Sequence, residues 1–224
     1  MAEGNKKAII VGATGLIGSE LLDLLLRNAE YKEVLSIVRR KMSVEHPKLS
    51  QLVINFDDLS EYSDVIKGHA VFCCLGTTKK QTPDTKMYYK IDHDYPVLLA
   101  EIAAKNGMSQ YHYVSSPGAD PKSSIFYTRT KGVSETDLKK VALPALFLYQ
   151  PSLLTGRIKD KRIVETIAEG IMKVINPLLL GSLKKYRSIA GKVVAKAMLK
   201  ESLSDKKGTF ILTSDEIQKI ADFK

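Results

Sequence analysis

Short apolar runs alternate with amphipathic stretches over the first two thirds of the chain, and this alternation restricts the fold more than any other feature. Strands are predicted at residues 8–11, 33–38, 51–56, 70–76, 111–116 and 145–150. Helices are predicted between them at residues 16–27, 57–67, 94–106 and 125–140. Strands that alternate with helices favour a mainly parallel sheet covered on both faces, so the sequence predicts an α/β, doubly wound fold.

The C-terminal third follows a looser pattern. Helices are predicted at residues 163–175, 189–199 and 215–221, with one more strand at 208–214. No repeat, low-complexity tract or clear linker divides the chain. We therefore expect one domain over residues 1–224, with residues 152–224 forming a small cap on the substrate side.

Composition excludes several classes of protein. The chain has 44% hydrophobic residues but no continuous apolar run of the roughly 18 residues that a membrane-spanning helix needs. Glycines interrupt the apolar N-terminal stretch, which argues against a secretory signal, so we expect a cytoplasmic protein. Cys73 and Cys74 are adjacent and too close for an ordinary disulfide. The four histidines lack metal-ligand spacing, so no metal site is predicted.

Positive charge is concentrated towards the C-terminus. The net charge is +9, and residues 157–224 hold 15 Lys and Arg against 8 Asp and Glu. A solvated basic surface explains this pattern, because no basic-aromatic motif typical of nucleic-acid binding accompanies it. We expect a small-molecule substrate, no nucleic acid and no membrane insertion. A homo-oligomer remains open, since another subunit could complete the substrate pocket.

Three glycines follow the first predicted strand at G-x-x-G-x-x-G spacing, and the first predicted helix begins among them. Such a turn lets the backbone approach a pyrophosphate, and the free N–H groups of the helix favour its negative charge. This context favours a dinucleotide site over a glycine turn without a ligand. The predicted cofactor-binding residues are Gly12, Thr14, Gly15, Leu16, Ile17 and Gly18.

Two arginines occupy the end of the second predicted strand. Arg39 and Arg40 stand where a carboxylate would bind the ribose hydroxyls of NAD(H). A guanidinium pairs well with a 2′-phosphate, so NADP(H) is preferred over NAD(H) unless the pair is merely an exposed strand end. Asp57 and Asp58 end the third predicted strand, where they either meet the adenine amino group or belong to a solvated turn.

A candidate acid/base site follows the fifth predicted strand. Tyr127 and Lys131 have Y-x-x-x-K spacing, which places them one helical turn apart on one face. A neighbouring ammonium would stabilise the tyrosine phenolate, so Tyr127 could exchange a proton with a substrate. Ser116 ends the strand and could hold a substrate carbonyl. The alternative is an ordinary Tyr/Lys pair on a helix surface.

The segments "GATGLIG", "FCCLGTT", "DHDY", "SSPGAD" and "YTRTKG" occur in this order. Together they resemble the atypical short-chain dehydrogenase/reductase superfamily, and within it the NAD(P)-binding group that includes the Tat-interacting oxidoreductase-like proteins. The similarity runs from Lys7 to about Gly156. It implies a Rossmann fold, NADPH as cofactor, and a catalytic triad of Ser116, Tyr127 and Lys131.

The resemblance also implies further roles by position. Ser116 matches the catalytic serine better than Ser115, which is kept as the alternative and as a cofactor-binding residue. The segment "QPSLL" resembles the segment that lines the nicotinamide pocket, although Gln150 replaces the arginine usual there. Further cofactor-binding residues implied in this way are Leu75, Gly76, Thr77, Tyr127, Lys131, Pro151, Ser152 and Leu153.

Two main functions and a weaker third remain open from the sequence. The first is an NADPH-dependent oxidoreductase of the short-chain dehydrogenase/reductase type that acts on a small carbonyl or alcohol. The second is an NADPH-binding regulatory or redox-sensing protein with little or no turnover. The third is a nucleotide-sugar epimerase or dehydratase, which the short C-terminal region disfavours.

Overall fold

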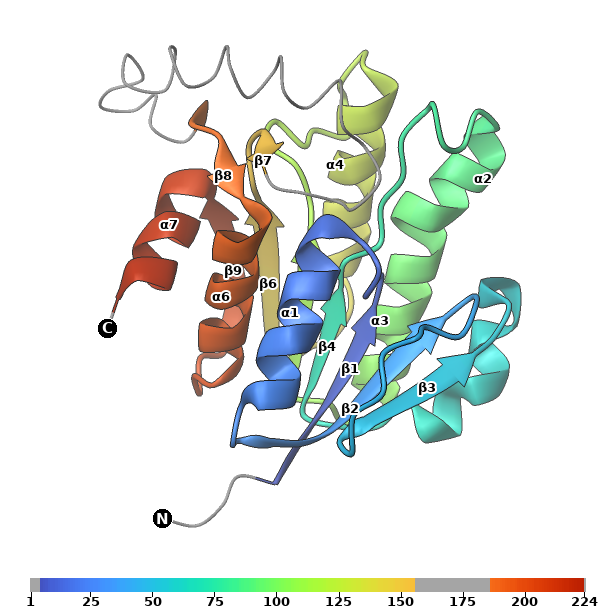
Figure 1. Cartoon of the computed structure of the whole chain (residues 1–224). Helices are drawn as coiled ribbons and strands as arrows, with labels where there is room; N and C mark the ends of the chain where they lie inside the picture. The colour runs from blue at the N-terminus through green and yellow to red at the C-terminus, as the bar shows by residue number, and fades with distance from the viewer. Residues whose placement is uncertain (1–4, 156–185, 224) are drawn as a thin grey trace.

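The structure is a computed structural model that describes residues 5–155 and 186–223. Its centre is a seven-stranded sheet with the order β3-β2-β1-β4-β5-β6-β9, in which every neighbouring pair is parallel (Figure 1). The strands are β1 (Lys6–Val11), β2 (Tyr31–Val38), β3 (Leu49–Val53), β4 (Ala70–Cys73), β5 (Gln110–Val114), β6 (Ala145–Gln150) and β9 (Gly208–Thr213). The predicted doubly wound Rossmann fold is confirmed.

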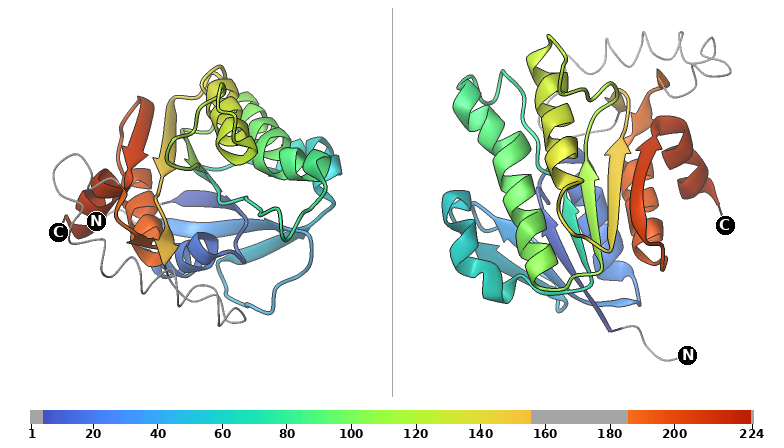
Figure 2. Two further views of the ribbon diagram at one scale, coloured as in Figure 1. Left: turned by 90° about the horizontal axis from the view of Figure 1, so that it is seen from above. Right: turned by 180° about the vertical axis from the view of Figure 1, so that it is seen from behind.

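Helices cover both faces of the sheet (Figure 2, left). One face carries α1 (Leu16–Arg27), α6 (Gly191–Ser202) and α7 (Ser214–Asp222). The other face carries α3 (Tyr95–Lys105), α4 (Phe126–Leu138) and the 3₁₀ helix η1 (Phe56–Val65). Within the described ranges, no helix combines the length and apolar character needed to cross a bilayer.

The five inner strands of the sheet are buried because their alternate side chains enter two separate cores, whereas the edge strands β3 and β9 are partly exposed. In β1, Ala8 and Ile10 face the core beneath α1 and α6, whereas Ile9 and Val11 face the core beneath α3. The continuous apolar run of β1 is therefore explained by burial on both faces. All four side chains are fully buried.

Several element boundaries differ from the sequence prediction. The third strand is Leu49–Val53 rather than residues 51–56, because Phe56 begins η1 and is buried by packing against Tyr95. The fourth strand ends at Cys73 rather than at residue 76. The structure also contains an unpredicted helix, α2 (Thr85–Tyr89), which continues through the π-helical segment η2 (Lys90–Asp94) into α3. The predicted helix at residues 163–175 lies outside the described residues.

The described C-terminal elements complete the sheet. β9 pairs with β6 in parallel, and α6 packs along α1. A small second sheet joins β7 (Leu154–Thr155) to β8 (Ile189–Ala190), which leads directly into α6. The assignment of residues 152–224 to a cap on the substrate side stays a prediction.

Candidate functional site

The glycine turn lies at the carboxyl end of β1, between the strand and α1 (Figure 1). Gly12 has a positive φ of 77°, and a side chain there would overlap the backbone of Cys74 at the end of β4. A Cβ on Gly18 would overlap the carbonyl of Gly12, so this glycine allows α1 to approach the strand closely. A Cβ on Gly15 would lie 3.4 Å from the Gly12 carbonyl oxygen, which is ordinary contact, so the outer side of Gly15 is open.

The N-terminus of α1 is available to an anion. Gly15 is its N-cap, no side chain in the described residues caps it, and its first turn contains no acidic residue. Leu16 and Ile17 open the helix, so their N–H groups belong to the unsatisfied first turn. Thr14 is exposed beside them. These features fit the pyrophosphate of a dinucleotide, which the helix dipole would also favour.

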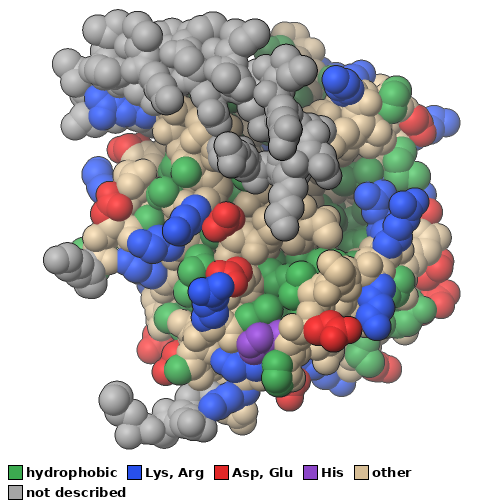
Figure 3. Space-filling view, viewed as in Figure 1, with side chains coloured by type: hydrophobic (Ala, Val, Ile, Leu, Met, Phe, Trp, Pro, Cys, Tyr) green, Lys and Arg blue, Asp and Glu red, His purple; other side chains and the backbone are tan. Residues whose placement is uncertain are grey.

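Arg39 and Arg40 follow β2 directly, and both are exposed. Figure 3 shows basic side chains on both sides of this face, including a group on the right-hand side, where β2 and β3 lie in Figure 1. Lys41 continues this run and is exposed as well. The arrangement is compatible with a 2′-phosphate partner, although this role stays a prediction.

Asp57 and Asp58 are both exposed, and the Asp57 carboxylate has partners in the protein. The Oδ1 atom of Asp57 accepts hydrogen bonds from Lys90 Nζ and from the Tyr95 hydroxyl, each at 2.8 Å. The bond from Lys90, followed by that from Tyr95, lowers the pKa of Asp57. The carboxylate is therefore ionised, and its Oδ1 atom already accepts two hydrogen bonds from the protein before any adenine binds.

Lys131 lies on α4 and is buried, with three acceptors around its ammonium. Nζ lies 2.8 Å from Asp92 Oδ1, and it donates to the Tyr113 hydroxyl at 3.0 Å and to the Val114 carbonyl at 3.1 Å. The ammonium therefore makes two hydrogen bonds and one ion pair, all with groups inside the protein. Burial alone would lower the pKa of Lys131, but the oxygens of Tyr113 and Asp92 outweigh it and raise that pKa well above its usual value.

Asp92 connects this ammonium to the loop after β4. Its Oδ2 atom accepts the backbone N–H of Thr77 at 3.0 Å, and its own carbonyl accepts from the hydroxyls of Tyr113 and Ser134, each at 2.8 Å. Asp92 is fully buried in the π-helical segment η2. Segments of this kind occur often at functional sites.

Tyr127 lies one turn before Lys131 on α4 and is 41% exposed. Its hydroxyl has no hydrogen-bond partner among the described residues. When ionised, Tyr127 is among the groups that raise the pKa of Lys131, so the phenolate and the ammonium interact electrostatically. The spacing therefore places the pair correctly on one helix face without joining it by a hydrogen bond.

The two serines after β5 differ in their surroundings. Ser115 Oγ donates to Glu135 Oε1 at 2.5 Å, and Gln150 Nε2 donates to the same oxygen at 2.8 Å. Ser116 is also buried, but its hydroxyl has no partner within the described ranges. A buried hydroxyl without a partner is costly, which makes Ser116 the better candidate to meet a ligand.

The other residues implied by the resemblance lie around the same end of the sheet. Leu75, Gly76 and Thr77 form the loop after β4, where Gly76 is exposed. Pro151 and Ser152 are buried after β6, while Leu153 is exposed. Ser152 donates its N–H to Ser214 Oγ at 2.7 Å and its hydroxyl to the Arg187 carbonyl. Its polar atoms therefore connect the segment after β6 to the segments before β8 and at the start of α7. Cofactor contacts by these residues stay predictions.

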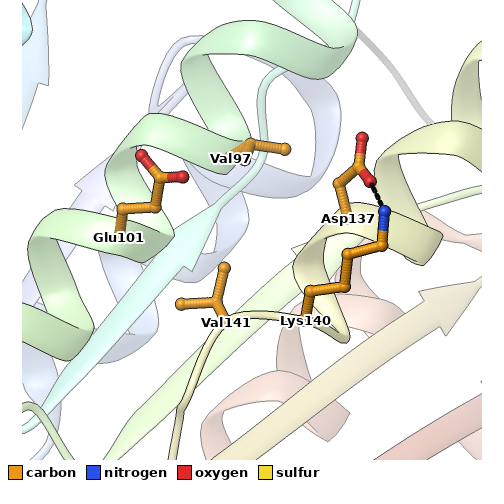
Figure 4. Close-up of a pocket in the computed structure, with 5 residues that line it drawn as sticks. All are labelled: Val97, Glu101, Asp137, Lys140 and Val141. Atoms are coloured by element: carbon orange, nitrogen blue, oxygen red, sulfur yellow. Dashed lines mark hydrogen bonds and ion pairs between the residues drawn. The ribbon is translucent and has the colours of Figure 1, made fainter.

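A separate groove lies on the outer surface between α3 and the end of α4 (Figure 4). Its volume is about 470 Å³, and it is lined by Val97, Glu101, Asp137, Lys140 and Val141. Lys140 pairs with Asp137 at 2.7 Å on the α4 side of the groove (Figure 4). It contains none of the predicted site residues, so the groove is no part of the candidate site.

Sequence reasoning missed two buried carboxylates at this site, Asp92 and Glu135. Glu135 lies on α4 one turn after Lys131, and its exposed fraction is 4%. Its i, i+4 spacing from Lys131 placed it on the same helix face and could have indicated it. Asp92 had no comparable signal, because "KIDHD" contains a second aspartate that is exposed.

The fold and this site define an NAD(P)-binding Rossmann protein. A family model described as NAD(P)H-binding matches residues 12–174, and the chain belongs to this family. Protein HTATIP2 of Rattus norvegicus is 33% identical over 168 residues, which cover 73% of this chain and 69% of the relative. The predicted resemblance to the Tat-interacting proteins is thereby confirmed.

Other relatives extend the similarity. Protein fmp52, mitochondrial, of Emericella nidulans is 29% identical over 201 residues, covering 85% of this chain and 86% of the relative. A UDP-N-acetylglucosamine 4-epimerase from Methanobrevibacter ruminantium M1 superposes with a TM-score of 0.70 at 17% identity, over 94% of this chain and 77% of the other. A putative NAD-dependent epimerase/dehydratase from Bacillus halodurans superposes with a TM-score of 0.69 at 19% identity, over 97% of this chain and 99% of the other. Likeness at this identity shows the fold alone, and the compartment of this chain stays a prediction.

Proposed function

We propose that this protein is an NADPH-dependent oxidoreductase that acts on a small carbonyl or alcohol. The observation that carries the proposal is the buried Lys131 ammonium, held one helical turn from an exposed tyrosine hydroxyl at the glycine-turn end of the sheet. The unpartnered hydroxyl of Ser116 at the end of β5 adds a donor for a substrate oxygen. Ser116, Tyr127 and Lys131 are the proposed catalytic residues.

In this proposal each side chain has a separate task. The nicotinamide, when bound, supplies the hydride chemistry. Tyr127 exchanges a proton with the substrate oxygen, and Ser116 donates a hydrogen bond to it. Lys131 favours the Tyr127 phenolate through space, because its ammonium is ion-paired with Asp92 and donates its hydrogen bonds elsewhere in the protein.

The preference for NADP(H) is part of the same proposal. Arg39 and Arg40 are exposed at the end of β2, where no carboxylate competes with a phosphate for the position. Guanidinium groups form charge-assisted hydrogen bonds with phosphate oxygens. Both arginines are therefore proposed to bind the 2′-phosphate.

One observation also supports an NADPH-binding regulatory protein with little turnover. The Lys131 ammonium is held by two hydrogen bonds and by its ion pair with Asp92, and the Tyr127 hydroxyl has no described partner. Lys131 therefore makes no hydrogen bond to the tyrosine that would exchange the proton, which favours low turnover. A protein of this kind would bind NADPH tightly and report it through a partner.

Cofactor binding and turnover separate these proposals. NADPH at about 100 times its Kd should raise the free energy of unfolding by about 2.7 kcal/mol in a dye-based thermal shift, and NADH should do less. A dye is needed because the chain has no tryptophan. With a panel of carbonyls and alcohols, Tyr127→Phe should lose at least 100-fold in kcat while the NADPH shift persists.

Full activity in Tyr127→Phe would refute the catalytic assignment. A large NADPH shift with no turnover on any member of the panel would instead favour the regulatory protein. Equal shifts with NADH and NADPH would refute the roles of Arg39 and Arg40.

A further inference from the structure

A charged cluster lies at the carboxyl ends of β2 and β3, beside the two exposed arginines. Lys90 Nζ and the Tyr95 hydroxyl both donate to Asp57 Oδ1 at 2.8 Å. The charge of Arg39 acts on Tyr95, where it opposes the rise in pKa that burial and Asp57 produce. Arg39 therefore lies within electrostatic range of the side chain that holds Asp57.

The pairing of the strands supports this placement. The backbone N–H of Ile54 donates to the Val38 carbonyl at 3.0 Å, which extends the contact between the strands to the residue just before Arg39. Asp57 lies three residues after Ile54, in the first turn of η1. The Asn55 side chain accepts a hydrogen bond from the Asp57 N–H at 3.3 Å. Arg39 and Asp57 therefore both lie just beyond the carboxyl ends of the paired strands β2 and β3.

A carboxylate in this position has an electrostatic consequence. Asp57 is ionised at neutral pH, and an uncompensated negative charge near a phosphate raises the free energy of phosphate binding. Lys90 supplies the compensating charge directly on the carboxylate. Both side chains are partly exposed, at 42% for Lys90 and 43% for Asp57, so solvent and salt can reach the pair.

We propose that Lys90 is a specificity-determining residue for NADP(H), because it neutralises Asp57 beside the site of the 2′-phosphate. The proposal rests on the proposed function, in which Arg39 and Arg40 bind that phosphate. NAD(H) carries a hydroxyl at this position, so its binding is far less sensitive to the charge of Asp57. Lys90 thus acts through Asp57 on the choice between the two cofactors.

The test compares the Kd values of NADPH and NADH, followed by cofactor fluorescence at about 0.01 M salt, where the Debye length is about 30 Å. Lys90→Met should raise the Kd of NADPH about 5-fold and that of NADH less than 2-fold. The double variant Lys90→Met with Asp57→Asn should bind NADPH within about 2-fold of the wild type, because both charges of the pair are then absent. At about 1 M salt the effect of Lys90→Met should largely disappear.

Lys86→Met is the matched control. Lys86 lies one helical turn before Lys90, is exposed, and loses the same charge on substitution. It should leave the ratio of the two Kd values unchanged. Exposed ion pairs contribute little to stability, so Lys90→Met should fold, and its thermal unfolding without cofactor checks this.

Three results would overturn the proposal. These are an equal loss of NADPH and NADH binding in Lys90→Met, no rescue by Asp57→Asn, or the same change of ratio in Lys86→Met. If the wild type prefers NADPH and Lys90→Met keeps the same preference, the result contradicts this inference and leaves the proposed function intact. A wild-type protein that binds neither cofactor contradicts the proposed function itself.

Discussion

The Lys131 ammonium and the Asp92 carboxylate lie 2.8 Å apart, and water reaches neither side chain appreciably, with exposed fractions of 4% and 0%. The pair joins α4 to the π-helical segment, and through Thr77 it also joins the loop after β4. A charge in the low-dielectric interior is stable only while its partner is present. The proposed acid/base site is therefore built on a pair of mutually dependent groups.

Removing Asp92 alone should be strongly destabilising. Asp92→Leu leaves the Lys131 charge buried without a counter-ion, and we expect a loss of about 3–5 kcal/mol in the free energy of unfolding. Asp92→Leu combined with Lys131→Met should be less destabilised than Asp92→Leu alone, because no unpaired charge remains. Urea denaturation of the three proteins measures these differences, and a cost below about 1 kcal/mol for Asp92→Leu would contradict the dependence.

The two serines after β5 should respond in opposite ways to loss of the hydroxyl. Ser115→Ala removes a 2.5 Å hydrogen bond to the buried Glu135 carboxylate and should cost about 1.5–3 kcal/mol of stability. Ser116→Ala removes a hydroxyl without a described partner, so stability should change little or rise, while turnover falls. Thermal unfolding and kcat of both variants test this, and the reverse order of stability would exchange the two roles.

The arginines at the end of β2 should control cofactor choice. Arg39→Gln combined with Arg40→Gln should weaken NADPH binding at least 10-fold and leave NADH binding within about 2-fold, because only the former carries the 2′-phosphate. Lys67→Gln with Lys105→Gln removes the same charge from exposed positions at the opposite end of the sheet. This control should leave both Kd values unchanged, and an equal loss in it would indicate a general effect of net charge.

His112 should make stability depend on pH. It is buried between Phe72 and Phe147, and burial lowers its pKa from 6.5 to about 3. The unfolded chain therefore binds the proton more readily, so stability is present above about pH 6.5 and falls as the pH decreases towards 3. Between pH 7 and 5 the wild type should lose about 2 kcal/mol more than His112→Gln. Parallel losses in the two proteins would assign the pH dependence to other groups.

The sequence predicted most of the fold because the inner strands of the sheet are buried on both faces. In β1 and β6, continuous apolar runs can satisfy both cores, so the runs themselves identify the strands. The third strand was misplaced for the same reason. Ile54 and Phe56 are apolar and buried, but they lie beyond the end of β3, in the connection to η1 and at its first residue.

The candidate site was less accessible to sequence reasoning. Spacing alone places Tyr127 and Lys131 on one face of α4, since the helix repeat determines that relationship. The ion pair between Lys131 and Asp92 depends on the π-helical conformation of residues 90–94. Local composition does not encode that conformation. Asp92 and Asp94 have the same side chain, yet the first is buried and the second exposed.

The position of β9 affects how the chain can be made. β6 is paired on one edge with β5, and its other edge is closed by residues 208–213, far along the sequence. Until those residues have been synthesised, β6 presents unpaired backbone groups beside mainly apolar side chains. A growing chain therefore passes through a stage in which its sheet is open to pairing with other chains, and assistance by chaperones would be most useful at that stage.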